Sequence, residues 1–111
     1  MIDEITFRRH ADQAIESLKK SLIVAEEGGD FEVEEQSGAL NIVFEEPPAK
    51  FVVTPNAPVR QIWISALSTS FKLDWSEEGS AFVFSKDGLT LKPLVARLIN
   101  QQLGTDSVTL A

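Results

Sequence analysis

The order of its patterned segments constrains this chain most: a helical pattern, six short strand patterns and a second helical pattern. Apolar residues of the first segment recur every three or four positions, as on one face of an α-helix: Phe7, Ala11, Ala14, Ile15, Leu18, Leu22 and Ala25. Asp3 can cap the start of this helix, and Gly28-Gly29 ends it. The second helix is predicted over Leu91–Leu103, with Thr90 as its N-cap and Gly104 at its end.

Between the two helical segments, apolar and polar residues alternate in short runs, which is typical of half-buried β-strands. The predicted strands are Phe31–Glu35, Leu40–Glu45, Phe51–Thr54, Arg60–Ala66, Phe71–Trp75 and Ala81–Phe84. Turns or breaks are predicted at Gln36-Ser37-Gly38, Pro47-Pro48, Pro55-Asn56-Ala57-Pro58, Glu77-Glu78-Gly79 and Lys86-Asp87-Gly88. Connections this short favour an antiparallel meander of about six strands. With both helices covering one face, the prediction is an α+β fold, a two-layer α-β sandwich that makes residues 1–111 a single domain.

Charge and composition exclude several classes of function. The chain has 17 acidic and 10 basic residues, a net charge of −7, whereas nucleic-acid binding needs a basic face. It has no cysteine for disulfides or thiolate metal sites, and no apolar run long enough for a membrane helix. We therefore expect a cytoplasmic protein that binds neither nucleic acid nor membranes. The acidic face and antiparallel edge strands predict a monomer.

The acidic excess is concentrated in the first third of the chain. Residues 1–35 carry ten acids and four bases, and the stretch from Glu26 to Glu46 carries eight acids and no base. Carboxylates alone are hard oxygen ligands, suited to Mg²⁺, Ca²⁺, Mn²⁺ and the harder iron states. Because an exposed ridge has no preformed geometry, cation binding is expected to be weak. Two other interpretations stay open: a solvated face that keeps the protein soluble, and a docking surface for a basic partner.

Two bases, Lys19 and Lys20, interrupt this acidic run in the first helix. Glu16 and Lys20 stand four residues apart, in the order that favours a surface ion pair. Such a pair would partly remove Glu16 as a ligand, which leaves the residues from Glu26 to Glu34 as the better candidates.

Trp63 lies on the predicted strand 60–66, opposite the apolar face that Ile62 and Ile64 form. Gln61 and Ser65 share its face, which the helices do not cover, so we expect Trp63 to be substantially exposed. An exposed tryptophan is a frequent anchor for a protein partner. The alternative is that Trp63 packs against a neighbouring strand and has no further role.

The sequence offers no convincing catalytic group. His10 is the only histidine and is expected to be an isolated surface residue of the first helix. Ser65, Ser68, Thr69 and Ser70 form a predicted polar turn, and no cysteine or second histidine could activate a hydroxyl there. The glycines match no phosphate-binding spacing.

Five stretches stand in a familiar order and spacing: His10–Gln13, Gly38–Glu45, Pro58–Ser65, Asp87–Thr90 and Gln101–Gly104. The most specific is Pro58-Val59-Arg60-Gln61-Ile62-Trp63-Ile64-Ser65, which is similar to a strand of the form P-x-[KR]-Q-[IV]-W-[LI]-[AS]. Together with the acidic first third, these stretches resemble the frataxin family over nearly the whole chain, and most closely its bacterial branch, the CyaY proteins.

The resemblance implies the same α-β sandwich and a role in iron–sulfur cluster assembly, as an iron-binding protein that modulates the cysteine desulfurase. It implies that acids of the first helix and first strand bind Fe²⁺ and Fe³⁺ weakly, with no tight cofactor, and also meet a basic patch of the desulfurase. By position these acids are Glu4, Asp12, Glu26, Glu27, Asp30, Glu32 and Glu34. The sheet surface with Trp63, Gln61 and Arg60 is implied to meet the cluster scaffold protein.

The chain also departs from its bacterial relatives. Lys19, Lys20, Ile23 and Val24 stand where relatives carry acids, and Thr54 where they often carry asparagine. We therefore expect weaker iron binding and a desulfurase contact shifted toward the strand end of the ridge.

Two alternative functions stay open: a purely allosteric adaptor of the desulfurase with incidental metal binding, and a ferroxidase that detoxifies iron by self-assembly. The first helix lacks the inward Glu-x-x-His motifs of carboxylate iron enzymes, so beyond a weak ferroxidase activity we expect no enzyme.

Overall fold

The structure is a computed structural model that describes residues 2–28, 31–36, 38–45, 48–105 and 108–110. Over these ranges the elements are α1 (Glu4–Glu26), β1 (Glu32–Gln36), β2 (Ala39–Glu45), β3 (Pro48–Asn56), the 3-10 helix η1 (Ala57–Val59), β4 (Gln61–Ala66), β5 (Thr69–Ser76), β6 (Ala81–Phe84), β7 (Leu89–Thr90) and α2 (Leu91–Leu103). The strands form one antiparallel sheet in chain order, from β1 to β7.

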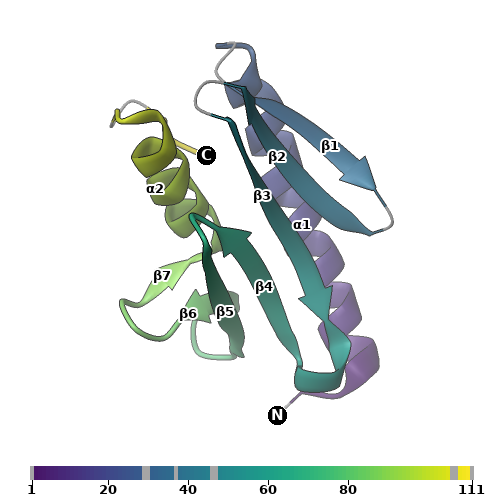
Figure 1. Cartoon of the computed structure of the whole chain (residues 1–111). Coiled ribbons are helices and arrows are strands. Elements are labelled where there is room, and N and C mark those ends of the chain that lie inside the picture. Colours follow the sequence, from purple (N-terminus) through teal and green to yellow (C-terminus); the bar gives the residue numbers. More distant parts are fainter. Residues whose placement is uncertain (1, 29–30, 37, 46–47, 106–107, 111) are drawn as a thin grey trace.

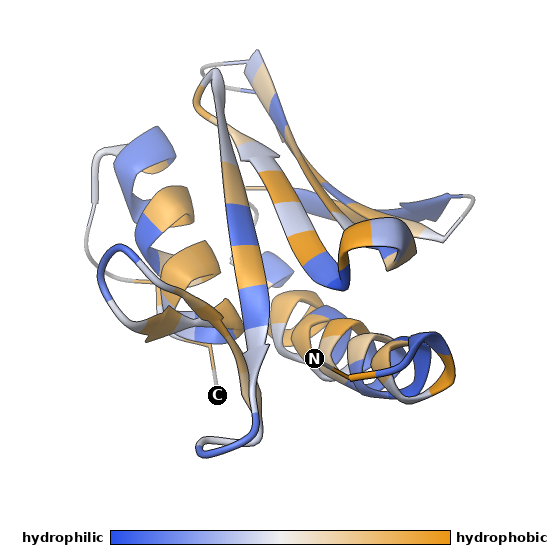
Figure 2. Cartoon of the chain, turned by 90° about the horizontal axis from the view of Figure 1, so that it is seen from below, coloured by the Kyte–Doolittle hydropathy of each residue, from blue (hydrophilic) through white to orange (hydrophobic). Residues whose placement is uncertain are grey.

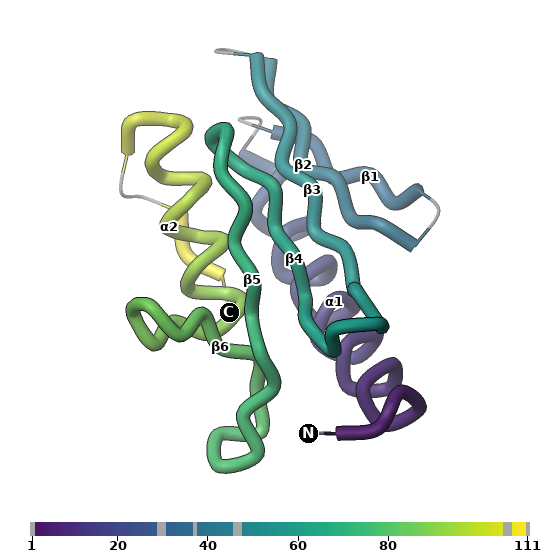
Figure 3. The backbone as a smooth tube through the Cα atoms, turned by 60° about the horizontal axis from the view of Figure 1, so that its bottom comes forward, coloured from purple at the N-terminus to yellow at the C-terminus, as the bar shows by residue number. Residues whose placement is uncertain are grey.

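Both helices lie against the same face of this sheet (Figure 1). The predicted two-layer sandwich is therefore confirmed, although the described residues form seven strands where about six were predicted. In Figure 3, α1 passes behind β2, β3 and β4, whereas α2 lies on the side of β5 and β6. Neither helix in the described ranges is long and apolar enough to cross a membrane.

The first helix forms where its apolar spacing and its cap predict it. Asp3 is the N-cap, and its carboxylate accepts a hydrogen bond from the backbone N–H of Thr6 at 2.7 Å. That bond lowers the pKa of Asp3 below its usual value. The buried face of the helix consists of Phe7, Ala11, Ile15, Leu18 and Leu22. The helix ends at Glu26, two residues before Gly28, and Gly29 lies outside the described residues.

The inner face of the sheet supplies the other half of the core, because every second residue of a strand points to the same side. Leu40, Ile42 and Phe44 of β2 are buried, as are Phe51 and Val53 of β3, Ile62 and Ile64 of β4, Leu73 of β5 and Phe82 of β6. Figure 2 shows the alternation of apolar and polar residues as bands along the strands. Burying one such side chain stabilises the fold by about 1.5–3 kcal/mol.

The third strand is longer than predicted, because β3 includes both Pro48 and Pro55. Pro48 is its first residue, a position that needs no ladder bond from proline. The pairing of β3 with β2 stops at Val53, so Pro55 has a strand on one side only, where a residue without an N–H is tolerated. The predicted loop at 55–58 is therefore wrong for its first two residues. Pro47 lies outside the described residues.

The fifth strand is also longer, because the turn before it is shorter than predicted. Leu67 and Ser68 both have positive φ, 52° and 60°, which is the geometry of a two-residue hairpin turn. Thr69 and Ser70, predicted as part of a polar turn, belong to β5.

The last strand was missed in the sequence because Leu89–Thr90 is only two residues long. Asp87 holds the turn before it: its carboxylate accepts the N–H of Leu89 at 3.1 Å and lies 2.7 Å from the Arg97 guanidinium of α2. Loss of hydration raises the pKa of Asp87, but the bonds from Leu89 and Arg97 outweigh it and hold the pKa below its usual value.

The second helix, α2, has the bounds that were predicted, and its end at Gly104 follows from a φ of 68° that glycine adopts readily. Thr90 occupies the N-cap position without a side-chain cap hydrogen bond. After the helix the chain folds back: the Asn100 side chain accepts the N–H of Val108 and donates to its carbonyl oxygen. Val108 and Leu110 pack against the core.

Candidate functional site

Two surfaces carry the residues singled out in the sequence. The first, here called the acidic surface, consists of the exposed acids of α1 and β1. The second, here called the Trp63 face, is the part of β4 and β5 that points away from the helices.

The acidic surface is built where the end of α1 lies beside the edge strand β1 (Figure 1). A carboxylate oxygen of Glu26 accepts the backbone N–H of Val33 at 2.8 Å, which joins the helix to the strand. The Lys19 ammonium lies 3.3 Å from the Glu35 carboxylate and makes a second link. Glu26 is therefore half-buried and has a structural contact, in contrast with its exposed neighbour Glu27.

Glu32 and Glu34 are exposed, with half-buried Val33 between them, as the alternation of β1 predicted. Glu32 pairs with Val43 of β2, and Val43 pairs with Lys50 of β3. One basic residue therefore lies on the same line across the sheet as Glu32, two strands away. Asp30 lies outside the described residues.

The acids of α1 are spread along the helix and do not meet. Glu4 lies in the first turn and pairs with Arg8 at 3.1 Å, and it is about 33 Å along the axis from Glu26. Asp12 is exposed halfway, about 21 Å from Glu26. Within the described ranges, no three histidine or carboxylate side chains converge to hold one metal ion. The predicted residues thus form a distributed surface, and metal binding by them stays a prediction.

The late part of α1 carries an apolar and basic interruption of this surface. Ile23 is 43% exposed and Val24 is 69% exposed, between Lys20 and Glu27. The expected pair of Glu16 with Lys20 is not among the ion pairs of the described residues, where Lys19 pairs with Glu35. The acids of the acidic surface are therefore most concentrated at the end of α1 and on β1.

The Trp63 face is a connected set of four side chains. The indole Nε1–H of Trp63 donates to Oε1 of Gln61 at 2.8 Å, and Nε2–H of Gln61 donates to the carboxylate of Asp74 at 2.9 Å. The Lys72 ammonium lies 4.8 Å from the centroid of the Trp63 ring, a cation–π distance. The register of the hairpin explains the set, because Gln61 pairs with Asp74 and Trp63 pairs with Lys72.

Trp63 is half-buried, so the expectation of substantial exposure is wrong. The reason is that Gln61 of β4 accepts the indole N–H and Lys72 of β5 lies over the ring. Lys72 and Asp74 were missed in the sequence, although the alternation of strand 71–75 places both on the face opposite Leu73. Whether Trp63 anchors a partner stays a prediction.

Arg60 stands at the edge of the Trp63 face, in a left-handed conformation with a φ of 55°. It ends η1 and is not part of β4, which begins at Gln61. Its guanidinium donates to the carbonyl oxygen of Ala57, while its buried Nε has no hydrogen-bond partner among the described residues. Arg60 is thus turned toward its own loop.

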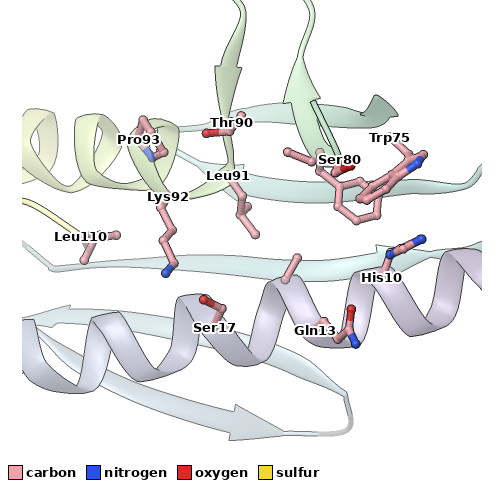
Figure 4. Close-up of a pocket in the computed structure, with 13 residues that line it drawn as sticks. His10, Gln13, Ser17, Trp75, Ser80, Thr90, Leu91, Lys92, Pro93 and Leu110 are labelled. Atoms are coloured by element: carbon pink, nitrogen blue, oxygen red, sulfur yellow. The ribbon is translucent and has the colours of Figure 1, made fainter. Parts of the chain in front are cut away.

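A groove of about 450 Å³ lies between α1, α2 and the β5–β6 hairpin (Figure 4). At one end the His10 ring stacks on Trp75, with centroids 4.0 Å apart and planes 13° apart. The expectation of an isolated His10 is therefore wrong: the side chain is half-buried against the inner face of β5. The alternation of strand 71–75 places Trp75 with Phe71 and Leu73 on the face that the helices cover, but it does not identify His10 as its partner.

The chain matches known proteins along most of its length. A family model described as a frataxin-like domain matches residues 1–105. The iron–sulfur cluster assembly protein CyaY of Pseudomonas fluorescens (strain Pf0-1) is 28% identical over 105 residues, 95% of this chain and 93% of that protein. The CyaY protein of Azotobacter vinelandii is 30% identical over 77 residues, 69% of each chain.

Among solved structures, a frataxin from Psychromonas ingrahamii is similar with a TM-score of 0.78, over 98% of this chain and 96% of that one. Its sequence identity is 18%, so the likeness is one of fold. The resemblance that the sequence motifs indicated is confirmed by these matches.

Proposed function

The chain belongs to the frataxin-like family, and from this premise we propose that it acts in iron–sulfur cluster assembly, as a weak iron binder that modulates the cysteine desulfurase and scaffold complex. The observation that carries the proposal is the family match over residues 1–105, together with relatives named as iron–sulfur cluster assembly proteins. The proposed setting is the bacterial cytoplasm, and the protein acts as a monomer and without enzymatic turnover.

Iron is cargo in this proposal and is bound by the acidic surface. Exposed carboxylates such as Glu27, Glu32 and Glu34 are hard oxygen donors for Fe²⁺ and Fe³⁺. Because they are spread over a helix end and a strand, each ion meets few ligands at once and exchanges quickly. Lys19 further lowers the local negative charge by its pair with Glu35. These features support weak binding of mixed occupancy.

The same acidic surface is proposed to dock a basic patch of the cysteine desulfurase. Complementary charge raises the association rate and selects the partner. The strongest negative field lies at the end of α1 and on β1, because Lys19, Lys20, Ile23 and Val24 interrupt the acids earlier in the helix. The docking contact is therefore centred on Glu27, Glu32 and Glu34.

The Trp63 face is proposed to meet the scaffold protein. A tryptophan held on a flat strand pair presents a large rigid contact with few rotors to immobilise. It lies on the face of the sheet opposite both helices, so a partner can reach it while the acidic surface holds the desulfurase.

A second candidate, a purely allosteric adaptor, is favoured by the separation of Glu4, Asp12 and Glu26 along α1. Acids this far apart cannot build one iron centre, and a docking surface does not need one. The same separation weighs against a ferroxidase, which needs several carboxylates around an iron pair.

An anaerobic Fe²⁺ titration followed by amide resonances of labelled protein tests the iron proposal. We expect loss of signals at residues 31–35 and at the end of α1, and weaker losses in a Glu32→Gln/Glu34→Gln variant. Glu78→Gln is the matched control for loss of charge, because Glu78 is an exposed turn residue far along the chain from α1 and β1. Broadening that is diffuse or absent would leave the adaptor function as the better one. The rate of Fe²⁺ oxidation, measured with and without the protein, distinguishes the iron binder and the adaptor from a ferroxidase, which alone would raise that rate.

A further inference from the structure

The hydrogen bonds of the Trp63 face form a chain that begins at a carboxylate. Asp74 accepts from Gln61, and Gln61 accepts from the indole N–H of Trp63. We propose that Asp74 is the positioning residue for Trp63: acting through Gln61, it fixes the indole in the orientation that the scaffold protein contacts. This inference rests on the proposed function, which gives this face to the scaffold.

The chemistry of the three groups explains why Asp74 controls the arrangement. An indole N–H can only donate, and a carboxylate can only accept, whereas the amide of glutamine does both from opposite ends. With Asp74 on one side, the NH₂ end of Gln61 turns to the carboxylate, and its oxygen is left facing Trp63. Without that carboxylate, the indole N–H alone orients the amide of Gln61, and the acceptor of the indole N–H is held less firmly.

Lys72 holds the same ring from the neighbouring strand. It is the cross-strand partner of Trp63, and its ammonium lies over the ring at 4.8 Å. Lys72 and Asp74 are two residues apart on β5 and therefore share a face. One strand thus supplies both the group that fixes the indole edge and the group that lies over its plane.

The value of this arrangement to a binding partner is preorganisation. A half-buried tryptophan that is already held need not lose rotamer freedom when a partner binds, and such ordering otherwise weakens affinity by about two- to tenfold for each side chain. It also gives Asp74 a role unlike that of Glu32 and Glu34, because one oxygen of its carboxylate accepts the hydrogen bond that orients Gln61.

The test uses four variants: Asp74→Ala, Asp74→Asn, Trp63→Ala and the control Glu78→Gln. The first readout is solvent exchange of the Trp63 indole N–H in the free protein, with the indole of Trp75, the second of the two tryptophans, as internal reference. The second readout is the Kd for the scaffold protein, measured by calorimetry. Asp74→Asn keeps a carbonyl acceptor for Gln61 and removes the charge.

We expect Asp74→Ala to accelerate exchange at Trp63 alone and to weaken scaffold binding about three- to tenfold. Asp74→Asn stays close to the wild type in both readouts, and Trp63→Ala weakens binding more than either. If Trp63→Ala weakens binding but Asp74→Ala does not, the positioning role is overturned. An Asp74→Asn variant as weak as Asp74→Ala overturns it too, because the effect would then come from charge.

The two proposals fail in different ways. If the wild-type protein does not bind the scaffold at all, the proposed partner of this face is wrong. The positioning of the indole is still decided in that case, because exchange at Trp63 that is equal in the wild type and Asp74→Ala overturns it without any partner present.

Discussion

The contact between Glu26 and Val33 gives Glu26 a structural role that the neighbouring acids, proposed to bind iron and the desulfurase, do not have. The carboxylate of Glu26 accepts the backbone N–H of Val33 in the edge strand β1 at 2.8 Å. A shielded hydrogen bond to a charged acceptor contributes about 1.5–3 kcal/mol. Because Glu26 and Val33 are only half-buried, we expect Glu26→Ala to lower the free energy of unfolding by about 1–2 kcal/mol. That corresponds to a fall in Tm of about 4–10 °C for a domain of this size.

Urea unfolding followed by circular dichroism measures this change, and amide exchange at Val33 locates it. Glu26→Gln retains an acceptor and should stay within about 0.5 kcal/mol of the wild type, as should Glu27→Ala at the exposed neighbouring position. Equal stability of wild type and Glu26→Ala would refute the structural role. Equal losses in Glu26→Ala and Glu26→Gln would mean that charge, and not the hydrogen bond, links α1 to β1.

Three further predictions concern the fold and the acidic surface. Leu22→Ala removes a fully buried side chain and should cost about 2–5 kcal/mol in urea unfolding; a loss below 1 kcal/mol would contradict the packing of α1. Asp3 and Asp87 have lowered pKa values when folded, so their stabilisation is present above pH 3.8 and is lost as the pH falls through the folded-state values. An Asp3→Asn/Asp87→Asn variant should therefore show a shallower acid dependence of stability, and an unchanged slope would count against those two contacts. Glu32→Gln/Glu34→Gln should weaken desulfurase binding most at low salt, and a salt-independent loss would argue against charge docking.

The helices were predictable because their determinants are local. The spacing of Phe7, Ala11, Ile15, Leu18 and Leu22 is a helical period, and an N-cap lies within three residues of the N–H that it accepts. The strands were predictable where alternation runs for four or more residues. Their ends were not, because Pro55 is tolerated only where the partner strand β2 has already stopped, and this depends on pairing between distant segments.

The sequence predicts which residues of the candidate site share a face, but it does not predict which side chains contact one another. The sequence places Trp63 and Gln61 on one face of a strand, but the partners that hold them, Lys72 and Asp74, come from the next strand and depend on hairpin register. The same holds for His10, whose stacking on Trp75 joins residues 65 positions apart in the chain. Side-chain contacts that join distant segments follow from packing, which alternation within one segment does not specify.

The rate of cluster formation by a cysteine desulfurase and its scaffold protein tests the proposed function most directly. The rate is measured anaerobically over a range of concentrations of this protein, with Fe²⁺ supplied, alongside the Glu32→Gln/Glu34→Gln and Trp63→Ala variants. We predict a change in rate that saturates with wild-type protein and is reduced in both variants. A rate that is the same at every concentration of the wild-type protein would contradict a role in iron–sulfur cluster assembly.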